Sequence, residues 1–201
     1  MRIDRSLMPS VIPALRDTDK WNILGEGQGR WVFLLGGRVD AVAEAVALLQ
    51  RRHWQVFVHI DMVKGLTWDF EALRFFHEFA APDGIISTHG HAVNNAGKLG
   101  MMTIQRIFLI DSQSVDSGIT QIERQGADAV EVLPGILPNL VQKLLSRLKQ
   151  PLIAGGLITS IGQVQEALRA GAVSVSTSCP DLFEWVDKSA GPSSQTSYWP
   201  K

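Results

Sequence analysis

Residues 55–61 read Gln55-Val56-Phe57-Val58-His59-Ile60-Asp61, and the two alternating sets of side chains in this run differ in chemistry. Val56, Val58 and Ile60 are wholly aliphatic, whereas the set that begins with Phe57 becomes polar toward the C-terminal end. Successive side chains of a strand point to opposite faces. The aliphatic set therefore predicts a face covered by helices, and the other set predicts a face that points into the interior of a closed sheet.

Seven further apolar runs resemble this one, and helical patterns separate most of them. The predicted strands are residues 11–15, 31–35, 55–61, 84–88, 102–110, 129–133, 151–154 and 173–177, and the predicted helices are 40–53, 68–79, 114–125, 138–148 and 160–170. The helical pattern is weak before residue 31 and between residues 91 and 99. Strands that alternate with helices indicate a parallel sheet, either open and doubly wound or closed. The number of runs favours an α/β fold of the compact (β/α)₈ TIM-like barrel type with short loops.

The length and composition favour one globular domain. The chain has 201 residues, 45% of them hydrophobic, and a formal net charge of −1. Residues 1–186 are expected to form a single TIM-like barrel domain, and the Ser/Gly/Pro-rich residues 187–201 a disordered C-terminal tail. The balanced charge gives no argument for tight non-specific binding to nucleic acids.

Three features of the sequence suggest a cytoplasmic protein. The single cysteine, Cys179, excludes an intramolecular disulfide and suits a reducing compartment. No run of about 18 apolar residues predicts a membrane span, and the N-terminal residues lack the apolar stretch of a signal peptide.

Alternation in the other strands predicts more polar side chains in the interior. One aliphatic residue or more on each of four strands is assigned to the helix-facing side, namely Ile85, Ile104, Val130 and Val132, and Val173 and Val175. The inward-facing polar set is then Thr88, Thr103, Gln105, Glu131, Ser174, Ser176 and Ser178. Buried polar groups without partners cost several kcal/mol, so these groups should meet each other, water or a ligand. A polar core layer with a purely structural role is the alternative for each single residue. Binding sites of such barrels lie at the C-terminal ends of the strands.

Two segments near the end of the chain suggest a phosphate site. Gly155-Gly156 follows the seventh predicted strand, and Ser176-Thr177-Ser178 ends the eighth. In TIM-like barrels the loops after these two strands commonly bind phosphate, because glycines allow backbone N–H groups to approach an anion and hydroxyls add donors. The Gly-Gly pair alone is also compatible with a simple turn.

The side chains available for chemistry leave two alternatives open. No lysine lies in the interior of a predicted strand, which argues against a Schiff-base aldolase. Neither His59 with Asp61 nor His89 with His91 forms a strong metal motif, so no metal and no cofactor are predicted. Glu131 and His59 could act as acid and base on a small phosphorylated substrate, as in an isomerase or a lyase, or could hold the hydroxyl groups of a bound ligand.

Segments spread along the chain carry a family resemblance. They are Val11-Ile12-Pro13-Ala14-Leu15, Phe33-Leu34-Leu35, His59-Ile60-Asp61 with Lys64-Gly65-Leu66, Gly84-Ile85-Ile86-Ser87-Thr88, Gln105-Arg106-Ile107-Phe108-Leu109-Ile110-Asp111, Glu131-Val132-Leu133-Pro134-Gly135, Ala154-Gly155-Gly156-Leu157-Ile158 and Ser176-Thr177-Ser178. In this order, from about residue 10 to residue 186, the chain resembles the glycerol-uptake operon antiterminator family, the glycerol-3-phosphate-responsive regulators. The segments that begin at Gln105 and Glu131 are the most specific.

The resemblance implies a non-enzymatic TIM-like barrel that binds glycerol 3-phosphate as its effector. It further implies binding to leader mRNA, so that transcription reads through a terminator upstream of glycerol-metabolism genes; it also leaves room for a homo-oligomer. By this likeness Gly155, Gly156, Thr177 and Ser178 hold the phosphate. The glycerol part is surrounded by His59, Asp61, Gln105, Arg106 and Glu131, to which the strand alternation adds Thr88 and Ser176.

The chain departs from the family pattern at three positions. His89 follows Thr88 where the family usually has Arg or Lys, and Thr159 stands where a basic residue is common. Arg38 follows Gly36-Gly37, where an acidic residue is expected. These changes leave a different phosphorylated effector, or a different RNA partner, as an alternative.

Overall fold

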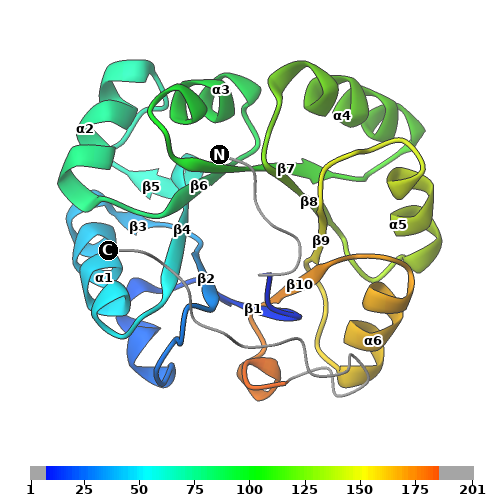
Figure 1. The fold of residues 1–201 in the computed structure, drawn as a ribbon, viewed down its shortest axis with the longest axis horizontal. Coiled ribbons are helices and arrows are strands. Elements are labelled where there is room, and N and C mark those ends of the chain that lie inside the picture. Colours follow the sequence, from blue (N-terminus) through cyan, green and yellow to red (C-terminus); the bar gives the residue numbers. More distant parts are fainter. Residues whose placement is uncertain (1–7, 186–201) are drawn as a thin grey trace.

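The computed structural model describes residues 8–185, and within them parallel strands close into a barrel (Figure 1). The strands follow each other around the ring in the order β1-β10-β9-β8-β7-β6-β4-β2. Their bounds are β1 Val11–Leu15, β2 Trp31–Leu34, β4 Gln55–His59, β6 Gly84–Ser87, β7 Met102–Phe108, β8 Ala129–Leu133, β9 Leu152–Gly155 and β10 Ser174–Thr177. The predicted (β/α)₈ TIM-like barrel is confirmed, and each predicted strand appears with small differences at its ends.

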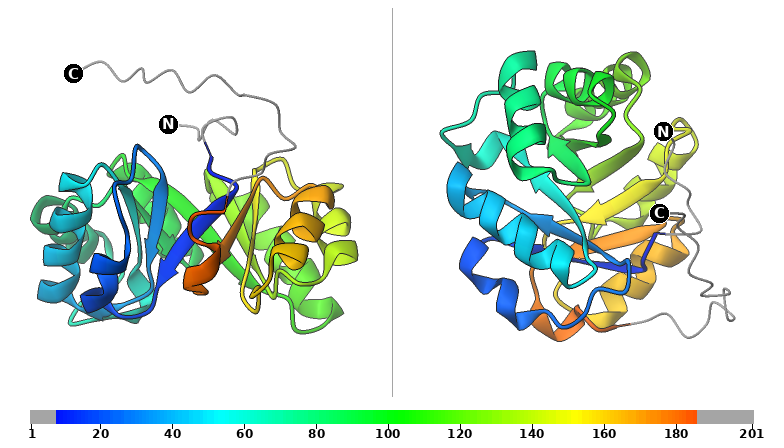
Figure 2. Two further views of the ribbon diagram at one scale, coloured as in Figure 1. Left: turned by 90° about the horizontal axis from the view of Figure 1, so that it is seen from below. Right: turned by 60° about the vertical axis from the view of Figure 1, so that its left-hand side comes forward.

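Helices cover the outside of the ring, as the side views of Figure 2 show. They are α1 Val39–Arg51, α2 Phe70–Ala80, α3 Gly90–Lys98, α4 Ser112–Gln125, α5 Pro138–Leu145 and α6 Ile161–Arg169. Short 3-10 helices span Thr18–Ile23, Ile60–Met62 and Pro180–Leu182. The Thr18–Ile23 helix and α3 therefore form in the two regions where the helical pattern is weak. None of the described helices is long and apolar enough to cross a bilayer.

A small parallel sheet, which the sequence did not predict, lies at the C-terminal ends of β2 and β4. Its strands are β3, Gly37–Arg38, and β5, Val63–Lys64, with Arg38 opposite Lys64. The two strands lie beside each other on the side of the ring formed by β4 and β6 (Figure 1).

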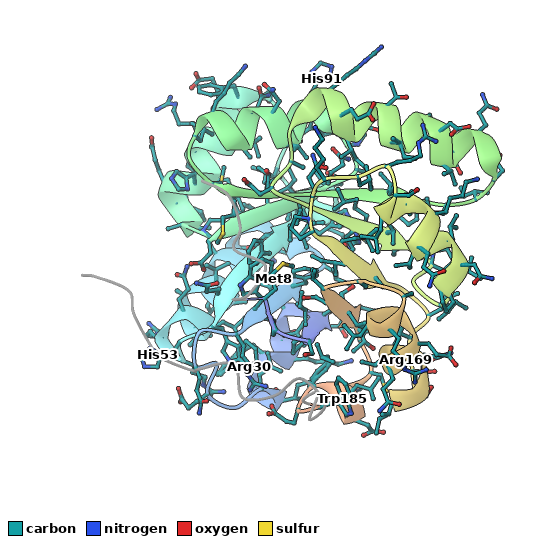
Figure 3. All side chains as sticks on the ribbon, turned by 45° about the vertical axis from the view of Figure 1, so that its right-hand side comes forward. Met8, Arg30, His53, His91, Arg169 and Trp185 are labelled. Carbon is teal, nitrogen blue, oxygen red and sulfur yellow. The ribbon has the colours of Figure 1, made fainter. Side chains whose placement is uncertain are left out.

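The hydrophobic core has an outer part between strands and helices and an inner part inside the barrel. Val56, Val58 and Ile60 belong to the outer part, as their alternation predicted. The inner part contains Met8, Ile12, Ala14, Trp31, Phe33, Phe57, Ile86, Ile104, Ala129 and Ile153. Met8 lies over the centre of the molecule in Figure 3 and is buried in this inner cluster. The N-terminal part of the barrel interior is thus filled with hydrocarbon.

The predicted inward orientation of Thr103 and Gln105 is wrong. Ile104 packs in the inner cluster, so its two neighbours on β7 face the helices. Thr103 accordingly bonds to Asp128 outside the barrel, with its hydroxyl 3.0 Å from the carboxylate. Isoleucine fits either face of a strand, which is why the direction of β7 could not be inferred from this residue alone.

Both predicted boundaries of the domain, residues 1 and 186, lie outside the described residues. Arg30, labelled in Figure 3, holds the last described turn by an ion pair of 3.1 Å to Glu184. The single domain over residues 1–186 stays a prediction, and the predicted tail, residues 187–201, lies outside the described residues.

Candidate functional site

The interior becomes polar where the strands approach their C-terminal ends. Arg106 on β7 and Glu131 on β8 are direct neighbours in the sheet, and Arg106 Nε donates a hydrogen bond of 2.7 Å to Glu131 Oε2. Ser176 on β10 donates to Glu131 Oε1 at 2.5 Å. These three side chains are 7%, 1% and 3% exposed. The inward prediction for Glu131 and Ser176 is confirmed, and both carboxylate oxygens are held in place.

Gly155 on β9 leaves the space that this cluster occupies. A Cβ atom at this position would lie 2.5 Å from Ser176 Oγ and 2.6 Å from Glu131 Oε1. Contacts that short would force the hydroxyl or the carboxylate to move. Gly155 therefore serves the buried carboxylate as well as the loop that follows.

His59 lies at the C-terminal end of β4 and shares the electrostatic environment of the cluster. Burial lowers the pKa of His59 to about 4, and the positive charge of Arg106 acts in the same direction against the carboxylates of Asp61 and Glu131. The imidazole is therefore neutral at pH 7. Its Nδ1 atom is buried and has no hydrogen-bond partner in the described part of the chain, so a ligand could supply one.

Asp61 joins the loop after β4 to the loop after β6. Its carboxylate accepts hydrogen bonds from Ser87 Oγ at 2.5 Å, from the Thr88 backbone N–H at 2.7 Å and from Thr88 Oγ1 at 2.6 Å. Burial by itself would raise the pKa of Asp61, but these hydrogen bonds outweigh it and lower the pKa below the ordinary value. Asp61 is therefore a carboxylate at neutral pH and orders the predicted ligand residue Thr88.

Gln105 supports the site from the outer face of β7. Its side chain is fully buried, and Nε2 donates to the carbonyl oxygens of Ser87 and Thr88 at 3.1 and 3.0 Å. Gln121 of α4 donates to the Thr88 carbonyl as well, at 3.1 Å. Ser87 and Gln121 were not predicted as site residues. No pattern within their own segments marks them, because their role depends on the packing of α4 against β7 and on the pairing of β7 with β6.

The two loops of the predicted phosphate site leave the barrel side by side. Ser176 is opposite Gly155 in the sheet, so Gly156 and Leu157 emerge next to Thr177 and Ser178. Gly156 and Leu157 have φ values of +77° and +62°, and positive φ in a leucine is uncommon outside functional or tight turns. Within the described residues, the backbone N–H groups of Gly156, Leu157 and Ser178 donate no hydrogen bond. These amides are therefore free to bind an anion.

The hydroxyls and the nearby helix contribute in different ways. Thr177 Oγ1 donates to the Ile158 carbonyl at 2.7 Å and accepts from the Cys179 N–H, so it joins the two loops. Ser178 is exposed. Gln163, which the sequence did not single out, accepts from the Thr159 N–H at the start of α6. The capping box of α6 engages the N–H groups of Ser160 and Gln163, so these two amides are not available to an anion.

Two surface clefts differ in their relation to this site. A cleft of about 230 Å³ includes Thr88 and Arg106 and continues between the C-terminal part of β7 and α4. A larger one, of about 310 Å³, lies at the opposite ends of β7 and β8, around Asn94, Lys98 and Asp128, and shares no residue with the polar cluster. We assign the site to the polar end because the buried charges lie there.

The side chains inside the barrel suit binding of a polar ligand better than covalent catalysis. Every lysine within residues 8–185 is exposed, so the described interior offers no amine for a Schiff base. In the same residues no group of three or more His, Cys, Asp or Glu side chains is placed to hold a metal ion. What the cluster offers is a guanidinium with free N–H donors, fixed carboxylates and a neutral imidazole.

Comparison with known proteins finds relatives that share both sequence and fold with this chain. The chain is 36% identical to a glycerol uptake operon antiterminator regulatory protein from Listeria monocytogenes, whose crystal structure matches 87% of this chain and 95% of that one with a TM-score of 0.80. A glycerol uptake operon antiterminator-related protein from Thermotoga maritima is 34% identical, with 89% and 99% covered and a TM-score of 0.77. The Escherichia coli protein YgcP is 28% identical over 167 residues, which are 83% of this chain and 87% of that protein. Because the pattern of the glycerol-3-phosphate responsive antiterminators also matches residues 11–183, the chain belongs to this family.

Proposed function

We propose that this protein binds glycerol 3-phosphate at the polar end of the barrel and, with the ligand bound, binds leader mRNA. Transcription would then read through a terminator upstream of glycerol-metabolism genes. The ligand must bind the RNA-competent state better than the other state, because otherwise it shifts no equilibrium. No cofactor takes part in this proposal.

The observation that carries the ligand half is the incomplete bonding of Arg106. A guanidinium has five N–H donors, and only the Nε donor of Arg106 makes a hydrogen bond within the described residues. Glu131 fixes the orientation of the guanidinium, so its terminal nitrogens are available to hydroxyl or phosphate oxygens. We place the glycerol part among His59, Asp61, Thr88, Arg106, Glu131 and Ser176, with Gln105 as support, and the phosphate on the loops of Gly155, Gly156, Thr177 and Ser178.

Calorimetry with glycerol 3-phosphate and with glycerol tests the ligand half. Loss of two charge-assisted hydrogen bonds predicts that glycerol binds about a hundredfold more weakly. Ser178→Asp should weaken glycerol 3-phosphate binding about tenfold by charge repulsion, whereas the uncharged variant Ser178→Asn, of the same size, should bind nearly as the wild type does. Equal affinity for Ser178→Asp and Ser178→Asn would contradict the position of the phosphate.

The alternative enzymatic function predicts consumption of the ligand. Glu131 and His59 remain the acid and base candidates for an isomerase or lyase, although both carboxylate oxygens of Glu131 are already engaged. We expect glycerol 3-phosphate to be recovered unchanged after prolonged incubation. Turnover of a phosphorylated triose that disappears in Glu131→Gln would favour the enzyme.

The RNA half is tested by selection from a randomised RNA pool in the presence of glycerol 3-phosphate. We expect the enriched RNA to bind more weakly when the ligand is removed. By linkage, the same RNA should raise the affinity for glycerol 3-phosphate by the same factor. An enriched RNA whose affinity ignores the ligand would contradict the regulatory switch.

A further inference from the structure

An exposed pair of aromatic rings lies next to the candidate site. Trp68, in the loop between β5 and α2, stacks on His89, the residue before α3, with ring centroids 4.5 Å apart and an interplanar angle of 5°. Trp68 is 44% exposed although it is a large apolar side chain. Proteins hold unpaired bases of single-stranded RNA by stacking them on exposed aromatic rings of this kind.

Positive charges in the small sheet at the barrel mouth adjoin this pair in the chain. Arg38 on β3 is directly opposite Lys64 on β5, and like charges in such positions destabilise a sheet unless anions lie nearby. Arg38 contacts Asp40, but Lys64 is exposed and makes no ion pair within the described residues. Asp69 keeps its negative charge, but its carboxylate accepts from the Thr67 hydroxyl and the Ala72 N–H and forms no ion pair with Lys64 within the described residues. A negatively charged partner would therefore relieve the repulsion around Lys64.

A second exposed aromatic pair shows why we infer RNA and not simply any apolar contact. Phe75 and Phe79 on α2 stack at 5.4 Å. Their helix carries Glu71 and Glu78, which flank Arg74 in ion pairs. Glu71 and Glu78 outnumber Arg74 on that surface and repel phosphates, whereas near Trp68 the side chain of Lys64 has no ion-pair partner among the described residues and can attract one.

Hydrogen bonds connect the aromatic pair to the ligand site. Ser87 Oγ donates to Asp61 and accepts from the His89 backbone N–H at 3.0 Å. Asp61 is a predicted ligand residue, and His89 is the ring on which Trp68 stacks. A ligand that contacts Asp61 or Thr88 thus acts on the segment that positions the stack.

We propose that Arg38, Lys64, Trp68 and His89, named here the RNA-binding surface, hold a single-stranded segment of RNA. A base stacks on Trp68, and adjacent phosphates lie against Lys64 and Arg38. The bonds from Asp61 through Ser87 to His89 make the position of the stack depend on the bound ligand. This inference rests on the proposed function, and it adds the place of the RNA contact and its coupling to the effector.

The test uses an RNA enriched from the randomised pool by the wild-type protein with glycerol 3-phosphate present. Trp68→Ala should weaken RNA binding about tenfold or more, because base stacking on one aromatic ring contributes about 1–3 kcal/mol, and Trp68→Phe should retain most of the affinity. Lys64→Gln should lower the salt dependence of binding by about one unit of slope. The matched controls Phe79→Ala and Lys98→Gln should bind RNA as the wild type does. Calorimetry on free Trp68→Ala should show glycerol 3-phosphate affinity within about threefold of the wild type.

The possible contradictions separate this inference from the function beneath it. If an RNA is enriched and both Trp68→Ala and Lys64→Gln bind it normally, the RNA-binding surface is wrong while the regulator stands. If glycerol 3-phosphate binds but no RNA is enriched, the RNA half of the proposed function fails and this inference fails with it. If Trp68→Ala converts a dimer to a monomer in sedimentation and leaves RNA binding intact, the surface is a contact between copies, which also overturns the inference.

Discussion

The barrel interior contains an apolar layer and a polar layer that the same strands supply. Phe57 and His59 are two residues apart on β4 and therefore lie on the same face, and Ile104 and Arg106 are related in the same way on β7. The apolar side chains of the first layer stabilise the fold because folding removes their surface from water. Buried charges in the second layer must overcome their own desolvation and contribute little net stability. Because the second layer contributes little to stability, its polar side chains are the part of the interior to which the proposed ligand binding is assigned.

Truncation in the apolar layer should have the largest effect on stability. Phe57 is fully buried and contacts Trp31 at a ring distance of 4.4 Å. Phe57→Ala leaves a cavity and should lower the free energy of unfolding by about 3–5 kcal/mol. Urea unfolding followed by circular dichroism measures the change. Phe79→Ala, which truncates a ring that is 53% exposed, is the matched control; a loss of the same size in both variants would contradict the role of the layer.

The sequence predicted the layers best where a strand has two chemically different faces. On β4 the aliphatic set and the Phe57-His59 set can only be arranged in one way, and the structure has that arrangement. On β7 both faces carry large apolar residues, Ile104 inside and Ile107 outside. Thr103 and Gln105 were therefore assigned to the wrong face. Direction on such a strand is decided by its neighbours, here by the pairing of Arg106 with Glu131.

Elements fixed by tertiary packing were the ones that the sequence missed. The α3 segment contains Gly90 and Gly97, which disfavour an isolated helix. It is helical because Ala92, Val93 and Ala96 are buried against the barrel. The β3–β5 pair is two residues long on each strand, too short for any periodic pattern. The supporting roles of Ser87 and Gln121 likewise arise only when distant segments meet.

The free energy of unfolding should depend on pH through the polar layer, with an effect smaller than that of Phe57→Ala. The unfolded chain protonates His59 near its ordinary pKa of 6.5, whereas burial holds the folded pKa at about 4. The contribution of His59 to stability is therefore fully present above pH 6.5. It is lost as the pH is lowered toward 4, because in that range only the unfolded state takes up the proton. At 1.36 kcal/mol per pKa unit the loss amounts to about 2–3 kcal/mol.

Urea unfolding at several pH values between 7.5 and 4.5 measures this loss, and His59→Gln should remove most of it. Asp61 does not add to the pH dependence in that window. Its pKa in the folded protein lies below the ordinary 3.8, so its contribution to the free energy of unfolding is lost only in stronger acid. The other histidines are present in both proteins and cancel in the comparison. Equal pH dependence of His59→Gln and the wild type would mean that the imidazole is not held neutral by the polar layer.

Conversion of the polar layer to hydrocarbon should change stability least of all. The triple variant Arg106→Met, Glu131→Leu, Ser176→Ala removes the ion pair together with the hydroxyl group that donates to its carboxylate. Replacing a buried pair by apolar groups of similar volume is often neutral or stabilising, whereas removing one partner costs about 3–5 kcal/mol. The triple variant should therefore unfold within about 1 kcal/mol of the wild type or at higher urea, while Glu131→Leu alone should be much less stable. Calorimetry should find no glycerol 3-phosphate binding to the triple variant. If the triple variant is as unstable as the single one, the charges are required for the fold itself, and the polar layer loses its status as a purely functional part of the barrel.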